Sequence, residues 1–191
     1  ISFGNFLLKQ VLSELSTELP NLQQFVTLSP LPLFAQGLRT LLAGQAPGWS
    51  AEDVDRLLSN HQSALQECTG LTSPAEAIKR LLQQPSLEHE QALAAPLARL
   101  ALAYLTECRQ NGSCLDPVAA FHLATGAILE RINVYADRSG RGERQSHMVM
   151  VNYRYDPEQV VANHEAFVHE GRIVMSLALQ REHAQHLAGE H

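Results

Sequence analysis

A serine and a histidine far apart in the sequence are the side chains best suited to acid–base chemistry. His122 lies among Val118, Phe121 and Leu123 in a short apolar segment. An imidazole ionises near neutral pH, so His122 could act as a general acid. A single histidine on an apolar helix is more often a packed core residue, so both interpretations stay open from the residues alone.

Ser29 stands in the segment Leu28-Ser29-Pro30-Leu31-Pro32, where we predict that a strand ends and a helix begins. Ligands often gather at such junctions in α/β folds. A serine before proline is also a common helix cap, and the local sequence favours this structural role. The two roles are compatible, because a capping hydroxyl accepts through its oxygen and can still donate its hydrogen.

The first residues, Ile1–Asn5, form a predicted glycine-containing loop that leads into an amphipathic helix ending near Leu19. Free backbone N–H groups and the positive end of the helix dipole suit a phosphate or pyrophosphate at such a place. One glycine is a weak signal, however, and by itself it indicates a plain turn into a helix.

An arginine- and glycine-rich segment links two predicted strands near the end of the chain. Its basic residues are Arg138, Arg141 and Arg144. A solvated hairpin connection and a flexible cationic clamp for phosphate or carboxylate explain it equally well. In the following strand we expect Tyr153 and Tyr155 to point to opposite faces, one into the core and one toward a pocket.

The elements that must position these groups follow an α/β order. A fully buried strand is expected at 25–28, helices at 29–42 and 157–170, a short helix between Asp116 and Gly126, strands at 128–135 and 148–155, and a last helix at 174–187. Residues 44–115 read as a series of helices inserted over one side of the sheet, with helix starts predicted at Ser50 and at Ser73. This order predicts an α/β protein with a mixed central sheet.

Composition narrows the class of protein. The 191 residues, 45% of them hydrophobic, suffice for one or two packed domains. The net charge of -6 argues against general nucleic-acid binding, and the sequence has no apolar run long enough to cross a membrane. Neither the histidines nor the three cysteines show metal-ligand spacing, so we expect no metal and reduced thiols. We expect a cytoplasmic protein without nucleic-acid or membrane partners.

The chain begins at Ile1, without methionine, and runs directly into the predicted N-terminal loop. We therefore expect it to be a piece of a longer polypeptide, with the strand that leads into this loop lying upstream.

Four blocks together resemble the catalytic domain of the malonyl-CoA decarboxylases: FGNFLLKQVLSEL, FVTLSPLPLF, DPVAAFHLATGAILERINVYAD and QSHMVMVNYRYD. Their order and spacing match over nearly the whole chain, and the combination is specific although each block is weak alone. The resemblance implies the fold of the GNAT acetyltransferases. It also implies that residues 1–191 are the C-terminal part of the catalytic domain, with the helical insertion at about 44–115. The upstream helical domain and the first half of the fold would be absent.

The resemblance also assigns residues. Ser29 matches the family's active-site serine, His122 its histidine, and Tyr155 a tyrosine that contacts the malonyl group. The positions that match the coenzyme A pyrophosphate loop are Ser2, Phe3, Gly4 and Asn5, and Ser29 also borders this site. The chain departs from the family pattern at Leu33, Thr125 and His147, where Gly, Asn and Gly are usual.

The implied reaction is decarboxylation of malonyl-CoA to acetyl-CoA and CO2, a step of fatty acid metabolism. The thioester carbonyl serves as the electron sink, so neither a metal nor an organic cofactor is required, and coenzyme A is part of the substrate. Ser29 and Tyr155 would stabilise the enolate by hydrogen bonds, and His122 would protonate it. Expected partners are malonyl-CoA and further copies of the chain in a homo-oligomer. The alternatives are a GNAT-type acyl-CoA N-acyltransferase and a non-catalytic coenzyme A-binding or assembly fragment.

Overall fold

The computed structural model describes residues 3–22, 24–84, 86–110 and 113–188. Its central element is a three-stranded sheet in the order β1 (Phe25–Pro30), β5 (Met150–Tyr155), β4 (Ile128–Asn133). Both strand pairs are antiparallel, and a single parallel bridge joins Leu129 to Met175. The predicted α/β class is confirmed. Among the described residues, the strands of this sheet pair antiparallel, and the bridge to Met175 is its one parallel contact.

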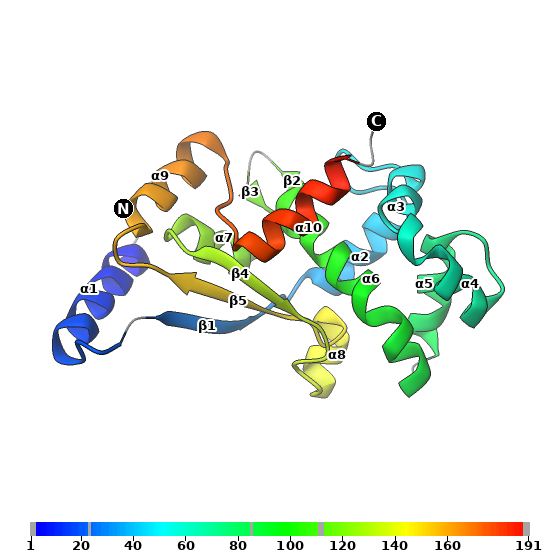
Figure 1. Ribbon diagram of the computed structural model, residues 1–191, viewed down its shortest axis with the longest axis horizontal. Coiled ribbons are helices and arrows are strands. Elements are labelled where there is room, and N and C mark those ends of the chain that lie inside the picture. Colours follow the sequence, from blue (N-terminus) through cyan, green and yellow to red (C-terminus); the bar gives the residue numbers. More distant parts are fainter. Residues whose placement is uncertain (1–2, 23, 85, 111–112, 189–191) are drawn as a thin grey trace.

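Helices lie over the sheet and extend well beyond one end of it (Figure 1). Their bounds are α1 Phe3–Glu18, α2 Phe34–Leu42, α3 Ala51–Leu57, α4 Gln62–Thr69, α5 Pro74–Gln83, α6 Leu87–Thr106, α7 Pro117–Ala124, α8 Gly140–Ser146, α9 Val160–Glu170 and α10 Leu177–Ala188. A 3-10 turn at Ser59–His61 and a small hairpin of β2 (Arg109–Gln110) and β3 (Ser113–Cys114) complete the described elements. The helical character predicted for residues 44–115 is thus confirmed up to this hairpin.

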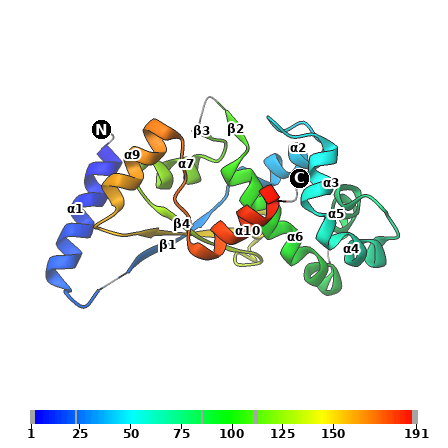
Figure 2. The same cartoon turned by 45° about the horizontal axis from the view of Figure 1, so that its top comes forward.

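The two ends of the molecule differ in the helices they carry. In both ribbon views α1 and α9 lie side by side at one end, and α3, α4 and α5 lie at the other (Figures 1 and 2). Between them, α6 and α10 contact β4, and α2 packs on α6. A buried apolar core that includes Leu31, Leu38 and Leu100 connects the sheet to the helices.

Local capping signals explain where several helices begin. The Ser50 and Ser73 hydroxyls accept hydrogen bonds from the backbone N–H groups of Asp53 and Glu76. Asp116 caps α7 in the same way, and Gly126, with φ +88, follows that helix. These starts were predicted, because a cap depends on residues within one turn of each other.

The segment around Ser29 differs from its prediction. Strand β1 continues through Ser29 to Pro30, and α2 begins only at Phe34. Ser29 and Leu31 each precede a proline, which disfavours helical backbone at both residues. Ser29 is therefore a strand residue and caps no helix. Alternate residues Val26 and Leu28 are exposed, so β1 is not the fully buried strand that was expected.

The arginine-rich segment also differs from its prediction, since it contains the helix α8 instead of an open hairpin loop. Ser139 caps this helix, and a Cβ on Gly142 would lie only 2.4 Å from the Asp137 carboxyl group. Arg138 forms an ion pair of 2.8 Å with Glu90 of α6. The segment is therefore folded against the helices, and one of its three arginines already has a carboxylate partner.

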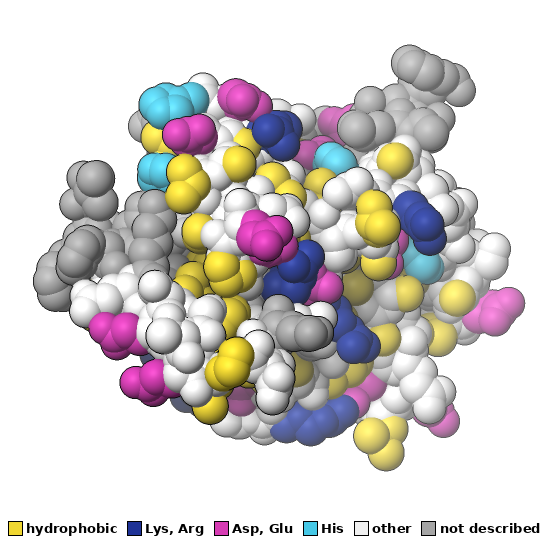
Figure 3. Space-filling view, turned by 60° about the vertical axis from the view of Figure 1, so that its left-hand side comes forward, with side chains coloured by type: hydrophobic (Ala, Val, Ile, Leu, Met, Phe, Trp, Pro, Cys, Tyr) yellow, Lys and Arg dark blue, Asp and Glu magenta, His cyan; other side chains and the backbone are white. Residues whose placement is uncertain are grey.

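The surface charges, the cysteines and the helix lengths bear on anion, metal and membrane binding. On the face drawn in Figure 3, lysine and arginine side chains lie among acidic and hydrophobic ones. Cys68, Cys108 and Cys114 are free thiols, and the last two are buried. Among the described residues no group of His, Cys, Asp and Glu side chains is arranged to hold a metal ion. Within the same part of the chain, every helix is too short or too polar to span a bilayer.

Candidate active site

Strand alternation places Ser29 on the inner face of the sheet. Its side chain is 7% exposed and shares this face with Thr27 and, on the neighbouring strand, with Tyr153 and Tyr155. Ser29 lies opposite Val151 in the register, and its hydroxyl is 3.1 Å from the Thr27 hydroxyl. The serine therefore faces the helices that cover this side of the sheet.

Helix α7 brings His122 onto the same face. The imidazole stacks on the ring of Tyr153, with centroids 4.4 Å apart and planes inclined by 16°. Its Nε2 lies 2.9 Å from Ser29 Oγ, and its Nδ1 lies 2.7 Å from Tyr155 Oη. The structure thus brings together the three residues that the resemblance singled out, although Ser29 and His122 are 93 positions apart.

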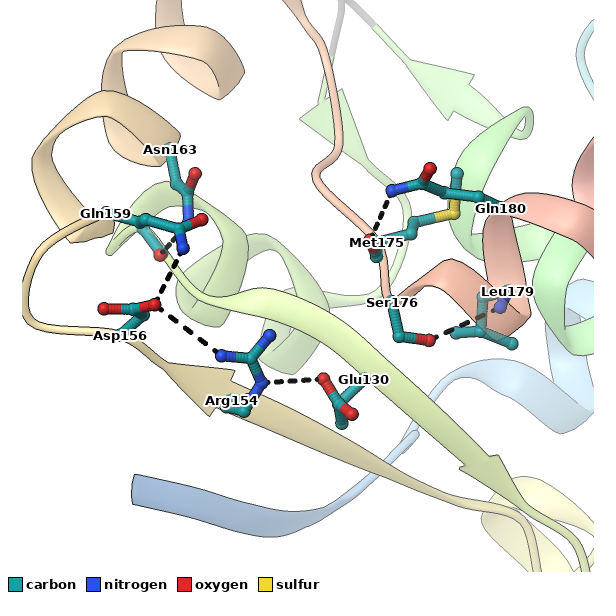
Figure 4. A network of polar contacts seen from close by, with 10 residues as sticks. Glu130, Arg154, Asp156, Gln159, Asn163, Met175, Ser176, Leu179 and Gln180 are labelled. Carbon is teal, nitrogen blue, oxygen red and sulfur yellow. Dashed lines mark hydrogen bonds and ion pairs between the residues drawn. The ribbon is translucent and has the colours of Figure 1, made fainter. Parts of the chain in front are cut away.

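Tyr153 and Tyr155 point to the same face, and the expectation of opposite faces was wrong. Residues two apart on a strand share a face, because the side-chain period of a strand is two. The intervening Arg154 projects to the other side, where it pairs with Glu130 and Asp156 at 2.9 and 3.8 Å (Figure 4). These ion pairs tie the end of β5 to β4 and fix the strand that carries both tyrosines.

Thr125 was noted only as a departure from the family pattern, yet it belongs to this cluster. Its hydroxyl lies 3.0 Å from Tyr155 Oη and 2.9 Å from the carbonyl oxygens of Phe121 and His122. A continuous chain of hydrogen bonds therefore runs from Thr125 through Tyr155 and His122 to Ser29. The sequence offered no signal for this contact, because it depends on how α7 packs against β5.

Two complete proton arrangements satisfy this chain. In one, Tyr155 donates to Nδ1 and Nε2–H donates to Ser29, which donates to Thr27. In the other, Ser29 donates to Nε2, Nδ1–H donates to Tyr155, and Tyr155 donates to Thr125, whose hydrogen goes to a carbonyl. The Ser29–His122 and His122–Tyr155 bonds are kept in both arrangements, but in the second the Ser29 hydrogen goes to Nε2 and no longer to Thr27.

Burial controls the ionisation of the site. Desolvation lowers the pKa of His122 to about 4, since an apolar environment disfavours the charged imidazolium. Desolvation likewise raises the pKa of Tyr155 to about 12. At neutral pH the site of the free protein therefore holds a neutral imidazole and an intact phenol. His122 is not the ready-made imidazolium acid that its ordinary pKa suggested.

This ionisation predicts how stability depends on pH. The pKa of His122 is 6.5 ordinarily and about 4 in the fold, so the unfolded chain takes up a proton first as pH falls. The free energy of unfolding therefore contains a contribution from the neutral His122 that is fully present above about pH 6.5. This contribution is lost as the pH falls through about 4, by on the order of 1–3 kcal/mol for a partly solvated ring. Urea unfolding at a series of pH values should show this loss in the wild type and lack it in His122→Asn. Parallel pH curves would contradict the assignment.

The predicted pyrophosphate loop is largely helical. Phe3, Gly4 and Asn5 form the first turn of α1, and Ser2 lies outside the described residues. The expected loop boundary was therefore wrong at these three positions. The backbone N–H groups of a first helical turn have no partners within the helix, so the helical form keeps the donors that an anion needs.

Comparison with known proteins shows the family of the chain. A sequence model described as the malonyl-CoA decarboxylase C-terminal domain matches residues 1–190. The chain belongs to the malonyl-CoA decarboxylase family. The mitochondrial malonyl-CoA decarboxylases of Anser anser anser and Rattus norvegicus are each 38% identical to it, over 174 and 168 residues. These matches cover 88% and 85% of the chain.

Solved malonyl-CoA decarboxylase structures share the fold. The structure from Rhodopseudomonas palustris has a TM-score of 0.77 at 38% identity, and the one from Cupriavidus metallidurans has 0.74 at 36%. Each match covers 95% of this chain but only 38% and 44% of those chains. The chain likewise spans about a third of the curated relatives, 34% and 33% of their lengths.

Proposed function

We propose that this chain supplies the catalytic side chains of an enzyme that converts malonyl-CoA to acetyl-CoA and CO2. The observation that carries the proposal is the contact of Ser29 Oγ with His122 Nε2, continued from Nδ1 to Tyr155. A hydroxyl, an imidazole and a phenol in series can bind an anion and move a proton without a metal. Membership of the malonyl-CoA decarboxylase family supports the choice of substrate.

In the proposed reaction the bond between the malonyl α-carbon and its carboxylate breaks. CO2 leaves, and the electron pair moves into the thioester carbonyl to give an enolate. The hydroxyl of Ser29 donates to the departing carboxylate or to the enolate oxygen, where a fixed donor lowers the barrier because charge develops there. Tyr155 holds the imidazole in place, and one proton from His122 at the α-carbon completes acetyl-CoA. No organic cofactor is required in this scheme.

The low pKa of His122 is compatible with this role because the substrate carries the missing charge. An anion within about 4–6 Å raises the pKa of an imidazole by about 1–3 units. The malonyl carboxylate next to Ser29 would bring His122 from about 4 into the range in which it is partly protonated near pH 6. We propose that the substrate recruits the proton that the reaction consumes.

Proton uptake on binding tests this step. The probe is a carboxyalkyl thioether of coenzyme A, which keeps the carboxylate but lacks the thioester carbonyl and so cannot lose CO2. Calorimetry at pH 6 in buffers of different ionisation enthalpy should show a substantial fraction of a proton taken up by the wild type and almost none by His122→Asn. Equal uptake in both proteins would assign the proton to another group.

An acyl-CoA N-acyltransferase is the enzyme class that must be separated from this proposal. The full-length protein is incubated with malonyl-CoA and no amine, and acetyl-CoA and CO2 are measured. We expect both products in equal amounts. Turnover only after an amine is added would indicate an acyltransferase, and coenzyme A binding without any turnover would indicate a binding or assembly fragment.

The remaining parts of the proposal concern the surroundings of the site. We infer that the first turn of α1, with Phe3, Gly4 and Asn5, binds the coenzyme A pyrophosphate together with Ser2. The GNAT-like arrangement, in which residues 44–115 are an insertion in the C-terminal part of a catalytic domain, agrees with the helices that follow α2. Action in fatty acid metabolism, a cytoplasmic location and a homo-oligomeric state stay proposals, and the curated relatives are named as mitochondrial.

A further inference from the structure

Asp116 is a fully buried carboxylate with bonds to two separate segments of the chain. Its side chain is 0% exposed. Oδ1 accepts hydrogen bonds from the N–H groups of Val118 and Ala119, at 3.0 and 3.2 Å, which is the expected cap of α7. Oδ2 accepts a third bond, at 3.1 Å, from the N–H of Leu33, a residue 83 positions away. The bond from Leu33 to Oδ2 is not needed to cap α7.

The two segments joined by Asp116 are those that carry the candidate catalytic pair. Leu33 is the residue before α2 and follows Ser29 by way of Pro30 and Pro32. Proline fixes its own φ and restricts the residue before it, so this link is stiff and an anchor at Leu33 also restrains Ser29. On the other side, α7 holds His122 about 1.7 turns from its cap.

Two opposing effects act on the Asp116 carboxyl group, and burial is the larger, so the pKa of Asp116 is raised overall. Burial raises the pKa of Asp116, and the backbone N–H groups of Leu33, Ala119 and Val118 lower it. Asp116 also caps the N-terminus of α7, where the positive end of the helix dipole favours a negative charge. A carboxylate is the acceptor-only group that can serve both segments at once.

We propose that Asp116 is a positioning residue that sets the distance between Ser29 and His122 by holding the segment after Ser29 against the start of α7. The proposal rests on the proposed function for its catalytic consequence. It assigns Asp116 no contact with the substrate. Its effect is to keep Ser29 Oγ and His122 Nε2 at 2.9 Å.

Asp116→Asn separates the bridge from the cap. Asparagine caps helices as well as aspartate does, so its carbonyl oxygen can keep the bonds to Val118 and Ala119. Its NH2 group then faces the N–H of Leu33, and two donors cannot bond. We expect kcat for malonyl-CoA to fall by on the order of a hundredfold, because small misplacements of catalytic groups have effects of that size. KM should change little, since Asp116 does not touch the substrate.

A matched control is available at the other end of the molecule. Asp55 of α3 accepts bonds from the Ala75 N–H and the Ser73 hydroxyl at the start of α5, at 2.9 and 3.1 Å. Asp55→Asn is therefore the same change in a carboxylate that joins two helices far from the site (Figure 1). It should lower the melting temperature while leaving kcat unchanged.

An NMR readout tests the bridge without relying on turnover. The imidazole resonances of His122, identified by their loss in His122→Asn, should shift in Asp116→Asn and stay in place in Asp55→Asn. Unchanged kcat and unshifted resonances in Asp116→Asn, or an equal loss of kcat in both aspartate variants, would overturn the proposal. If the wild type forms no acetyl-CoA, the proposed function fails. In that case the His122 resonances alone test the bridge by Asp116: a shift in Asp116→Asn supports it, and no shift overturns it.

Discussion

Replacing His122 by asparagine in the full-length protein should lower kcat for malonyl-CoA by about 10²- to 10⁴-fold, the usual contribution of general acid–base catalysis. The variant removes the group that contacts Ser29 and Tyr155 on its two nitrogens. It leaves α1 untouched, so the dissociation constant for coenzyme A should stay near that of the wild type. Steady-state kinetics and calorimetry with coenzyme A measure the two quantities.

His147→Asn is the matched control for this variant. His147 is also half-buried, but it lies beside α2 and α5, where it lines a cavity of about 330 Å³ with Arg39 and Lys79. Its backbone has φ +47, a conformation that asparagine tolerates. We expect normal turnover from it. Near-normal turnover in His122→Asn would remove His122 from the mechanism, whatever the control shows.

The second large effect is expected for Ser29→Ala. Removing one fixed donor to a developing oxyanion typically lowers kcat by about 10²- to 10³-fold. The loss of the hydroxyl also leaves His122 Nε2 without its 2.9 Å partner. The variant should have a lower kcat and a nearly unchanged KM, because the hydroxyl stabilises the charge that develops during the reaction. Initial rates of acetyl-CoA formation measure it.

Ser146→Ala controls for the loss of a buried hydroxyl. Ser146 is 2% exposed, and its Oγ donates to the Gly142 carbonyl within α8. We expect unchanged kcat from this variant. If Ser29→Ala retains wild-type kcat while its fold is intact, the hydroxyl stabilises no charge in the rate-limiting step.

Local signals in the sequence predicted several helix starts but not the site geometry. Caps such as Ser50 and Ser73 act within one turn, so they are readable from neighbouring residues. The Ser29–His122 contact joins residues 93 positions apart, and only the family resemblance pointed to it. The neutral state of His122 could not be foreseen either, because its low pKa arises from burial between α7 and the sheet.

The sequence itself contained the information that corrects two wrong predictions, the helix start at Ser29 and the opposite faces of Tyr153 and Tyr155. The prolines at 30 and 32 disfavour a helix at Ser29, which a cap-based interpretation overlooked. The two-residue spacing of Tyr153 and Tyr155 requires a shared face, and so predicts that both tyrosines lie beside whatever covers the sheet. Helix α8 is different. Its glycines indicate a loop, but Gly142 lies inside the helix, where a Cβ would come within 2.4 Å of the Asp137 carboxyl group, and Ser139 caps the helix start.

A crystal structure of the full-length protein with the carboxyalkyl thioether of coenzyme A would test the central claim most directly. The proposal predicts the probe's carboxylate within hydrogen-bond distance of Ser29 Oγ and His122 Nε2, and its pyrophosphate at the first turn of α1. Coenzyme A bound with its sulfur end away from His122, or an imidazole separated from Ser29 in the complex, would contradict it.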